Sequence, residues 1–355
     1  MYQKLQDETL KNGERVELGL LTGPDQSKLA GQVKALLGHK GKIWQWQIEQ
    51  SLGQQFKDAQ SRFYIALRNG QPLANVMTVE AFGIGIFGHV YARPEERRKG
   101  LSDRIIGTLV KDFRARAGKA LYLGTGFDSP AYHLYARHGF KSVEPKSGCM
   151  TWFAQTQEAF EQEAFAQGAT RREALSFEHW PTLPALSMMR HPARVRLATM
   201  DVLGPVLTEG GALPVLMATS AELDGDRQPI SEGPASLGRQ PAGGVSPRPP
   251  EERAQVAVSR TSDVPVAIAC IAPEPIFSKQ VDVLDLFCAP GFEGELQPLA
   301  EQLQLSAERT AVCYADSFWP AKQQVLRALH FVRASVLPKY FRAQGQAQDV
   351  ELWIR

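Results

Sequence analysis

Residues 90–102 of this 355-residue chain read VYARPEERRKGLS, and they carry more information than any other part of the sequence. An apolar strand ends at a proline, a basic turn follows, and an amphipathic helix begins just after Gly100. The first amides of a helix lack intrahelical acceptors and lie at the positive end of its dipole. Gly100 lets an anion approach closely, while Arg97, Arg98 and Lys99 add positive charge. The turn is therefore predicted to bind a pyrophosphate, the alternative being a solvated basic surface.

The segments that follow continue a strand and helix alternation. Apolar residues recur at helical spacing from Leu101 to Phe113. Residues 120–124 (ALYLG) are short and apolar, as in a buried strand. Ser129 and Pro130 then indicate a second helix, with an N-cap residue followed by proline at the first helical position. This second helix carries Tyr135.

Together these segments resemble the GNAT superfamily of acetyl-CoA-dependent N-acetyltransferases. The cofactor motif of that family is Arg or Gln, two residues, Gly, one residue, then Gly or Ala. It matches Arg97 to Ser102, and Ser102 departs from it mildly at the last position. A second family motif, Asn, two residues, Ala, two residues, Leu-Tyr, three residues, Gly-Phe, departs only at Asp128. Its matched residues are Asp128, Ala131, Leu134, Tyr135, Gly139 and Phe140.

The resemblance covers about residues 14–154 and implies a mixed α/β sheet. The expected elements upstream are a first strand at 15–21, helices at 26–37 and 44–52, and strands at 63–68 and 72–81 joined by an Asn-Gly turn. In such folds the fourth and fifth strands splay apart, and the pantetheine arm of acetyl-CoA lies between them. The resemblance implies that the acceptor pocket is lined by the two early helices, including Trp44 and Trp46.

The resemblance also assigns cofactor contacts along the strand and the basic turn. Asp128 either hydrogen-bonds the cofactor arm or caps its own turn. The expected cofactor-binding residues are Val90, Tyr91, Ala92, Arg97, Arg98, Lys99, Gly100, Leu101, Ser102 and Asp128.

Acyl transfer to an amine requires a proton donor for the departing thiolate and a route for the amine proton. The phenol of Tyr135 is protonated at neutral pH and can donate to the sulfur, the alternative being a tyrosine that only packs. The general base stays open. Many family members use a glutamate on the fourth strand, but residues 83–88 contain none, which leaves Glu80, His89 or a chain of water molecules.

The second half of the chain repeats the first in an altered form. Residues 120–140 align without a gap with residues 311–331, 63–81 resemble 255–272, and the strand before Pro94 resembles 281–290. Aligning Pro94 with Pro290 places Glu293 and Glu295 in the segment that corresponds to the basic turn at 97–102. Their negative charges would repel a pyrophosphate. Leu326 replaces Tyr135, and His330 replaces Gly139. We therefore expect two tandem GNAT folds, of which the second is degenerate.

These features predict a catalytic N-terminal domain at 1–154, a connector at 155–172 and a degenerate domain at 173–355. Residues 220–252 are rich in Pro, Gly, Ser and Arg and predict a flexible insertion in the second domain.

Composition restricts the class of protein further. A length of 355 residues suits two domains, and 43% hydrophobic residues is ordinary for a globular protein. A net charge of +2 argues against nucleic acid or membrane as partner. The four cysteines lack metal-ligand spacing, and no signal peptide or membrane span is evident, so we expect a cytoplasmic protein without metal.

The resulting interpretation is an N-acetyltransferase that uses acetyl-CoA and a small-molecule primary amine. A homodimer is compatible with this interpretation. The alternative is a non-catalytic acyl-CoA sensor or scaffold, which the intact Tyr135 disfavours.

Overall fold

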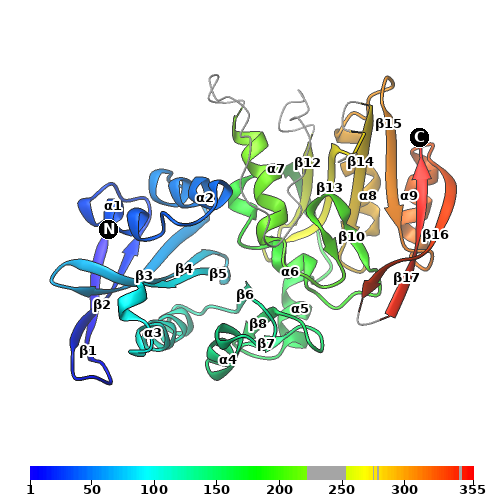
Figure 1. Cartoon of the computed structure of the whole chain (residues 1–355). Coiled ribbons are helices and arrows are strands. Elements are labelled where there is room, and N and C mark those ends of the chain that lie inside the picture. Colours follow the sequence, from blue (N-terminus) through cyan, green and yellow to red (C-terminus); the bar gives the residue numbers. More distant parts are fainter. Residues whose placement is uncertain (222–252, 275, 278–279, 344–345) are drawn as a thin grey trace. The chain divides into compact units, whose positions relative to one another are not determined.

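The computed structural model (Figure 1) describes residues 1–221, 253–274, 276–277, 280–343 and 346–355. Apart from its first two residues, the predicted insertion at 220–252 lies outside the described residues. The chain forms two compact units, Met1–Phe160 and Glu161–Arg355, and each contains one large mixed sheet.

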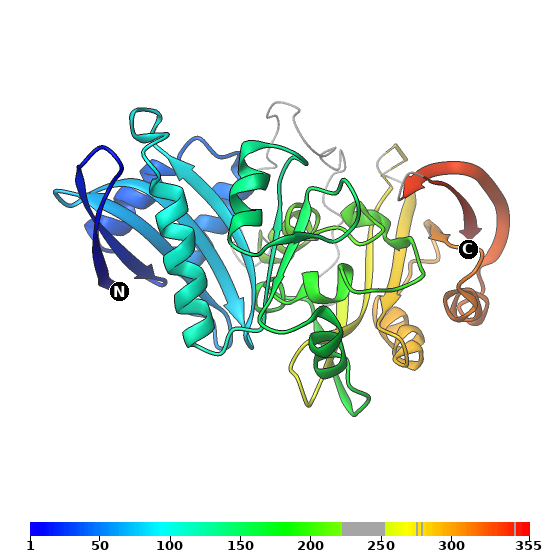
Figure 2. The same ribbon diagram turned by 90° about the horizontal axis from the view of Figure 1, so that it is seen from below.

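The first unit has an eight-stranded sheet in the order β1-β2-β3-β4-β5-β6-β8-β7. Helix α3 lies along one face (Figure 2), and α1 and α2 lie on the other (Figure 1). The elements are β1 (Tyr2–Thr9), β2 (Arg15–Thr22), α1 (Lys28–Leu36), α2 (Lys42–Gly53), β3 (Gln60–Arg68), β4 (Gln71–Ala81), β5 (Ile84–Ala92), α3 (Leu101–Ala115), β6 (Ala120–Gly124), α4 (Pro130–Arg137), β7 (Lys141–Ser142) and β8 (Cys149–Phe153).

Local sequence accounts for most of these elements. Asn69 and Gly70 have φ of 50° and 72°, the left-handed pair that a two-residue hairpin needs, which confirms the predicted turn between β3 and β4. The apolar face of α3 is buried from Leu101 to Phe113. The predicted first strand is in fact the second, because β1 pairs with β2 at the sheet edge. The residues of β1 are polar and half-exposed, so the strand is not detected by a search for apolar segments.

The strands β5 and β6 diverge, and this positions the site. Within the described residues they pair in parallel only over Ile84–Ile86 and Ala120–Tyr122. The remainder of β5, from Phe87 to Ala92, has β4 on one side and no paired strand on the other. An opening between the strands therefore begins near Phe87.

The second unit repeats this topology. Its sheet order is β9-β12-β13-β14-β15-β17-β16. Strand by strand, this order corresponds to β2-β3-β4-β5-β6-β8-β7 of the first unit. Its parallel pair β14 and β15 is likewise joined over three residues, Val281–Val283 and Thr310–Val312. The chain thus contains two α/β units in tandem, each with a mixed sheet of the same topology.

The main elements of the second unit are α5 (Gln157–Ala164), which begins in the first unit, β9 (Thr170–Ala174), α6 (Leu183–Ser187), β10 (Val195–Leu197), β11 (Val202–Leu203), α7 (Glu209–Ala221), β12 (Ala254–Ser259), β13 (Pro265–Pro273), β14 (Val281–Cys288), α8 (Leu296–Gln302), β15 (Thr310–Ala315), α9 (Pro320–Ala328), β16 (Val332–Ala343) and β17 (Gln346–Ile354).

Candidate active site

The basic turn between β5 and α3 presents free amides and open space. Arg104 N–H makes the first helical bond, to Gly100 O at 3.1 Å, so the N–H groups of residues 101–103 have no acceptor within the helix. Gly100 has φ of 89°, and a Cβ built there would meet only Lys11 Cε, 4.0 Å away. The protein therefore leaves room at the helix N-terminus for an anion.

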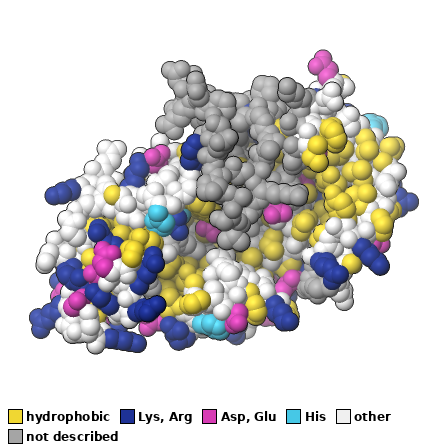
Figure 3. All heavy atoms as spheres, viewed as in Figure 1, with side chains coloured by type: hydrophobic (Ala, Val, Ile, Leu, Met, Phe, Trp, Pro, Cys, Tyr) yellow, Lys and Arg dark blue, Asp and Glu magenta, His cyan; other side chains and the backbone are white. Residues whose placement is uncertain are grey.

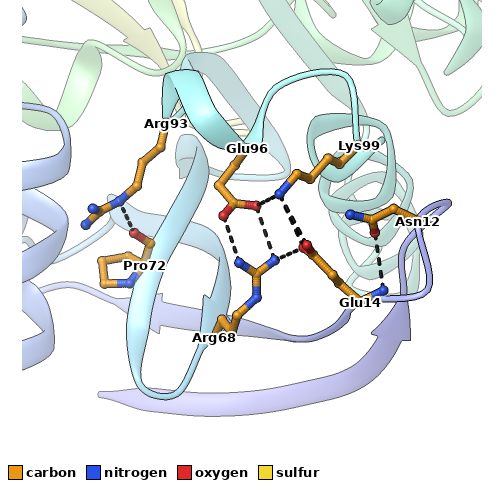
Figure 4. Close-up of polar contacts among 7 residues, drawn as sticks. All are labelled: Asn12, Glu14, Arg68, Pro72, Arg93, Glu96 and Lys99. Carbon is orange, nitrogen blue, oxygen red and sulfur yellow. Dashed lines mark hydrogen bonds and ion pairs between the residues drawn. The ribbon is translucent and has the colours of Figure 1, made fainter.

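Lys99 ties this turn to neighbouring strands (Figure 4). Its Nζ lies 3.0 Å from Glu96 and 3.3 Å from Glu14, and Arg68 pairs with the same two carboxylates. The hydrogen bond that Arg68 donates lowers the pKa of the buried Glu96, and the hydrogen bond that Lys99 donates to Glu96 raises the pKa of Lys99. The sequence predicts that Lys99 adds positive charge near the anion. In the structure its ammonium group pairs with Glu14 and Glu96 and stabilises the turn.

Arg97 and Arg98 are exposed and supply the remaining positive charge of the turn. Arg97 Nε donates to Ala92 O at 3.2 Å, and its guanidinium lies 5.8 Å from the centre of the Tyr91 ring. Basic and acidic side chains are otherwise interspersed over the visible, described part of the first unit (Figure 3).

The backbone of β5 directs donors into the opening. Arg93 N–H bonds Leu73 O of the preceding strand at 2.9 Å. Because successive residues of a strand direct their N–H groups to opposite sides, that of Ala92 faces away from β4. The N–H of Val90 points opposite to the His89 carbonyl of the same peptide, which accepts from Asn75 of β4, so it faces away as well. That side has no paired strand within the described residues, so both amides can bind an extended ligand.

Tyr135 on α4 lies beside the start of this opening. Its side chain is 6% exposed, and its ring centre is 5.3 Å from that of Phe87 in an edge-to-face contact. Phe87 is the first residue of β5 beyond the part paired with β6. The topology therefore brings Tyr135 to the diverging strands, where it packs against the core and borders the predicted path of the thioester.

Asp128 has a local partner. It has φ of 59°, a conformation that Asp tolerates, and its exposed carboxylate lies 2.9 Å from His133 Nε2. The following residue, Ser129, caps α4 as predicted by accepting from Tyr132 N–H at 3.1 Å. Of the two roles left open for Asp128, the observed contact favours stabilising its own turn.

The position and contacts of Glu80 do not favour a role as general base. Arg116 donates to its two carboxylate oxygens at 2.6 and 3.1 Å, and Thr78 Oγ1 donates at 2.6 Å. Glu80 also pairs with Gly85 at the beginning of β5, roughly 20 Å along the strand from the basic turn. A carboxylate held by a guanidinium this far along the strand is a structural ion pair.

His89 lies in the site but is a poor base. It occupies a bulge in β5, with φ of 49°, and is buried between β4 and α2. Burial lowers the pKa of His89 to about 3, so the ring is neutral and binds protons weakly. With neither candidate favoured, the water chain is the alternative that remains for the amine proton.

The two early tryptophans have different environments. Trp44 is half-buried and stacks edge-on against His89, with ring centres 5.6 Å apart. Trp46 is 8% exposed and belongs to the core. Residues two apart on a helix point to different sides, so Trp44 and Trp46 contact different parts of the first unit, and a role for Trp46 in the acceptor pocket stays a prediction.

Four further residues of the site carried no motif. Gln47 and Asn75 contact His89, and Glu14 and Arg68 hold the basic turn through Glu96 and Lys99. Only the i, i+3 spacing of Glu96 and Lys99 could have indicated any part of this network from sequence.

In the second unit the corresponding turn contains two carboxylates that accept hydrogen bonds from nearby groups. Glu293 accepts from Gly291 N–H at 3.0 Å, and Glu295 accepts from Thr170 and Arg172 at 2.7 Å. The pairing of β13 with β14 runs without the bulge seen between β4 and β5.

Residues 194–199 bind both diverging strands of the second unit. Thr199 donates to the buried Asp285 on β14, from N at 2.6 Å and from Oγ1 at 2.5 Å. Val195 N–H donates at 3.0 Å to Asp316, which follows β15, and Val195 O accepts from the buried Lys322. The opening that β5 and β6 leave in the first unit is therefore bridged by the chain itself in the second.

Comparisons with known proteins give one family match and several distant structural matches. Residues 33–140 match the model of the acetyltransferase (GNAT) family. A search of curated proteins finds no match. Solved structures that align include a GNAT acetyltransferase from Staphylococcus aureus (10% identity, 38% of this chain and 99% of that one, TM-score 0.31) and an acyl-CoA N-acyltransferase from Klebsiella pneumoniae (20%, 38% and 97%, 0.29). The PaiA N-acetyltransferase of Thermoplasma acidophilum, solved with coenzyme A, aligns at 11% identity over 38% and 98%, with a TM-score of 0.29.

The family match, at residues 33–140, lies within the first unit, Met1–Phe160. No group of three or more His, Cys, Asp or Glu side chains able to hold a metal occurs among the described residues. Likewise, none of the helices in the described part of the chain is long and apolar enough to cross a membrane.

Proposed function

We propose that the first unit transfers an acetyl group from acetyl-CoA to the primary amine of a small-molecule acceptor, with both substrates bound together. The observation that carries this proposal is the row of N–H donors without a backbone acceptor among the described residues, from Val90 and Ala92 on β5 to the first amides of α3. These donors follow the length of an extended thioester whose pyrophosphate end is anionic. Acetyl-CoA fits because Gly100 leaves the space that a phosphate requires.

Each group of the site then has a role. Arg97, Arg98 and the amides of α3 bind the pyrophosphate, and Lys99 holds the turn that carries them. The N–H of Val90 polarises the thioester carbonyl and stabilises the oxyanion that forms when the amine attacks. Tyr135 donates its phenolic proton to the sulfur as the C–S bond breaks. The proton of the attacking amine passes to water.

The domain assignment follows as part of the same proposal. Residues 1–154 form the catalytic domain, 155–172 the connector and 173–355 a domain that has lost the acyl-CoA site. The half-exposed Trp44, beside His89, is proposed to contact the acceptor. The four free cysteines are compatible with a cytoplasmic location.

The proposal is tested by incubating the full chain with acetyl-CoA and a panel of primary amines. We expect release of free CoA that depends on one class of amine, with the acceptor gaining the mass of one acetyl group. Acetyl-CoA binding without release for any amine would instead support the sensor alternative.

A further inference from the structure

Two buried amide side chains hold the bulge in β5. Asn75 on β4 is fully buried, and its Nδ2 donates to the carbonyl oxygen of His89 at 3.1 Å. Gln47 on α2 is also fully buried, and its Oε1 lies 2.6 Å from His89 Nε2. His89 is thus held through its backbone by one element and through its ring by another.

The contact with Gln47 determines which ring nitrogen carries the proton. An amide oxygen only accepts hydrogen bonds, so Nε2 of His89 is the donor and the neutral ring has its hydrogen there. In this orientation of the amide, Gln47 Nε2 donates to Ser51 Oγ at 2.8 Å. Burial keeps the ring neutral, and the nearby charges of Lys40 and His39 act in the same direction.

Asn75 is costly where it lies. Its Oδ1 is buried and has no hydrogen-bond partner among the described residues. An apolar side chain would avoid that cost, since an orphaned buried oxygen is unfavourable. The contribution of Asn75 is therefore its bond to the bulge carbonyl.

We propose that Gln47, His89 and Asn75 are positioning residues, which hold the bulge so that the next N–H, that of Val90, faces the opening beyond β6. This inference rests on the proposed acetyl transfer, because the bond partner of that N–H would be the thioester oxygen. His89 then acts through the backbone geometry and takes no proton from the amine. Misplacement of the donor would slow turnover without weakening the pyrophosphate contacts.

Two substitutions of His89 separate positioning from base catalysis. Gln can place an amide N–H where Nε2 lies but cannot accept a proton at neutral pH, whereas Ala can do neither. In the CoA-release assay on the full chain, we expect His89→Gln to keep kcat within a few-fold of the parent and His89→Ala to lower kcat by about tenfold or more. The affinity for acetyl-CoA, measured by calorimetry, should stay unchanged in both. Equal losses of kcat, or no loss in either variant, would overturn the proposal.

A second readout does not need an acceptor. We expect the ring ¹⁵N shifts of His89 to report a neutral Nε2–H tautomer throughout pH 5 to 8. Gln47→Leu should change these shifts and lower kcat, and Ser51→Ala is the matched control, because it removes a bond to the same amide but not the bond to His89. A ring that protonates in this range, or a Gln47→Leu variant identical to the parent, would refute the proposal. Absence of turnover in the parent with every amine would count against the proposed function instead.

Discussion

At the scale of single residues, Gly100 combines a left-handed backbone with empty space. Its φ of 89° disfavours any side chain, and its Cβ position is open apart from Lys11 Cε at 4.0 Å. An anion in that space would collide with a methyl group. The position can therefore be tested for ligand binding separately from backbone strain.

We expect Gly100→Ala to lower the affinity for acetyl-CoA by about a hundredfold or more while the protein stays folded, because only backbone strain of about 1 kcal/mol is added. Gly70→Ala is the matched control. Gly70 has φ of 72° and open surroundings but lies in the β3–β4 hairpin. Calorimetry measures the affinity, and thermal unfolding measures the strain. Equal affinities in the two variants would show that the phosphate binds elsewhere.

Tyr135 is the second residue whose role can be isolated. Tyr135→Phe removes only the phenolic oxygen and keeps the edge-to-face contact with Phe87. We expect kcat to fall by about 10²-fold, the usual scale for a positioned general acid, with the affinity for acetyl-CoA retained. Steady-state kinetics with a responsive amine and calorimetry measure the two quantities. Unchanged turnover would make Tyr135 a packing residue and leave the thiolate to be protonated by water.

At the scale of elements, the turn before α3 depends on a buried carboxylate. Glu96 is 6% exposed and accepts from Arg68 and Lys99. These partners lower the pKa of Glu96, so its carboxyl group is more readily ionised in the folded protein than in the unfolded chain. The stabilisation is therefore complete above the usual carboxyl pKa and is lost as the pH falls through the lower, folded value.

We expect Glu96→Gln to reduce the free energy of unfolding by about 1–2 kcal/mol at pH 7. The difference from the parent should narrow as the pH falls below about 4.5. Denaturant unfolding over a pH series measures it. The neighbouring Glu95, which is exposed, provides Glu95→Gln as a control with little expected effect. A difference that is constant with pH would mean that charge is not the cause.

Elements with a local signal could be predicted, and those set by tertiary pairing could not. The periodicity of α3, the cap of α4 and the Asn-Gly hairpin are all readable in single segments. The edge strand β1 is polar and is defined by pairing with β2. The bulge at His89 arises from a register shift between β4 and β5, and no residue pattern announces it.

The same distinction applies to the site. The basic turn and Tyr135 belong to contiguous motifs, so sequence was enough to select them. Lys99 pairs with Glu14 and Glu96, which Arg68 also contacts, and the buried partner of His89 comes from α2. Such contacts depend on which side chains the folded sheet brings together. Glu80 stayed among the candidate bases because its ion-pair partner, Arg116, is distant in sequence.

At the scale of the whole molecule, two units share one topology but differ at the place where an acyl-CoA would bind. The first has open amides at Gly100 and an unpaired stretch of β5. The second has Glu293 and Glu295 in the turn, no bulge, and residues 194–199 bonded to both diverging strands. Duplication of a fold therefore does not imply two equivalent sites.

We predict that the full chain binds one molecule of acetyl-CoA. Calorimetry should give a stoichiometry of one, since the second unit would have to displace residues 194–199 from the buried Asp285 and bring a polyanion beside Glu293 and Glu295. Gly100→Ala provides the internal test, because it alters only the first unit. If the stoichiometry of the parent is one and Gly100→Ala abolishes all measurable binding, the second unit contributes no acyl-CoA site. A second site of similar affinity, or binding that persists undiminished in the variant, would show that the bridged strands of the second unit open to admit the ligand.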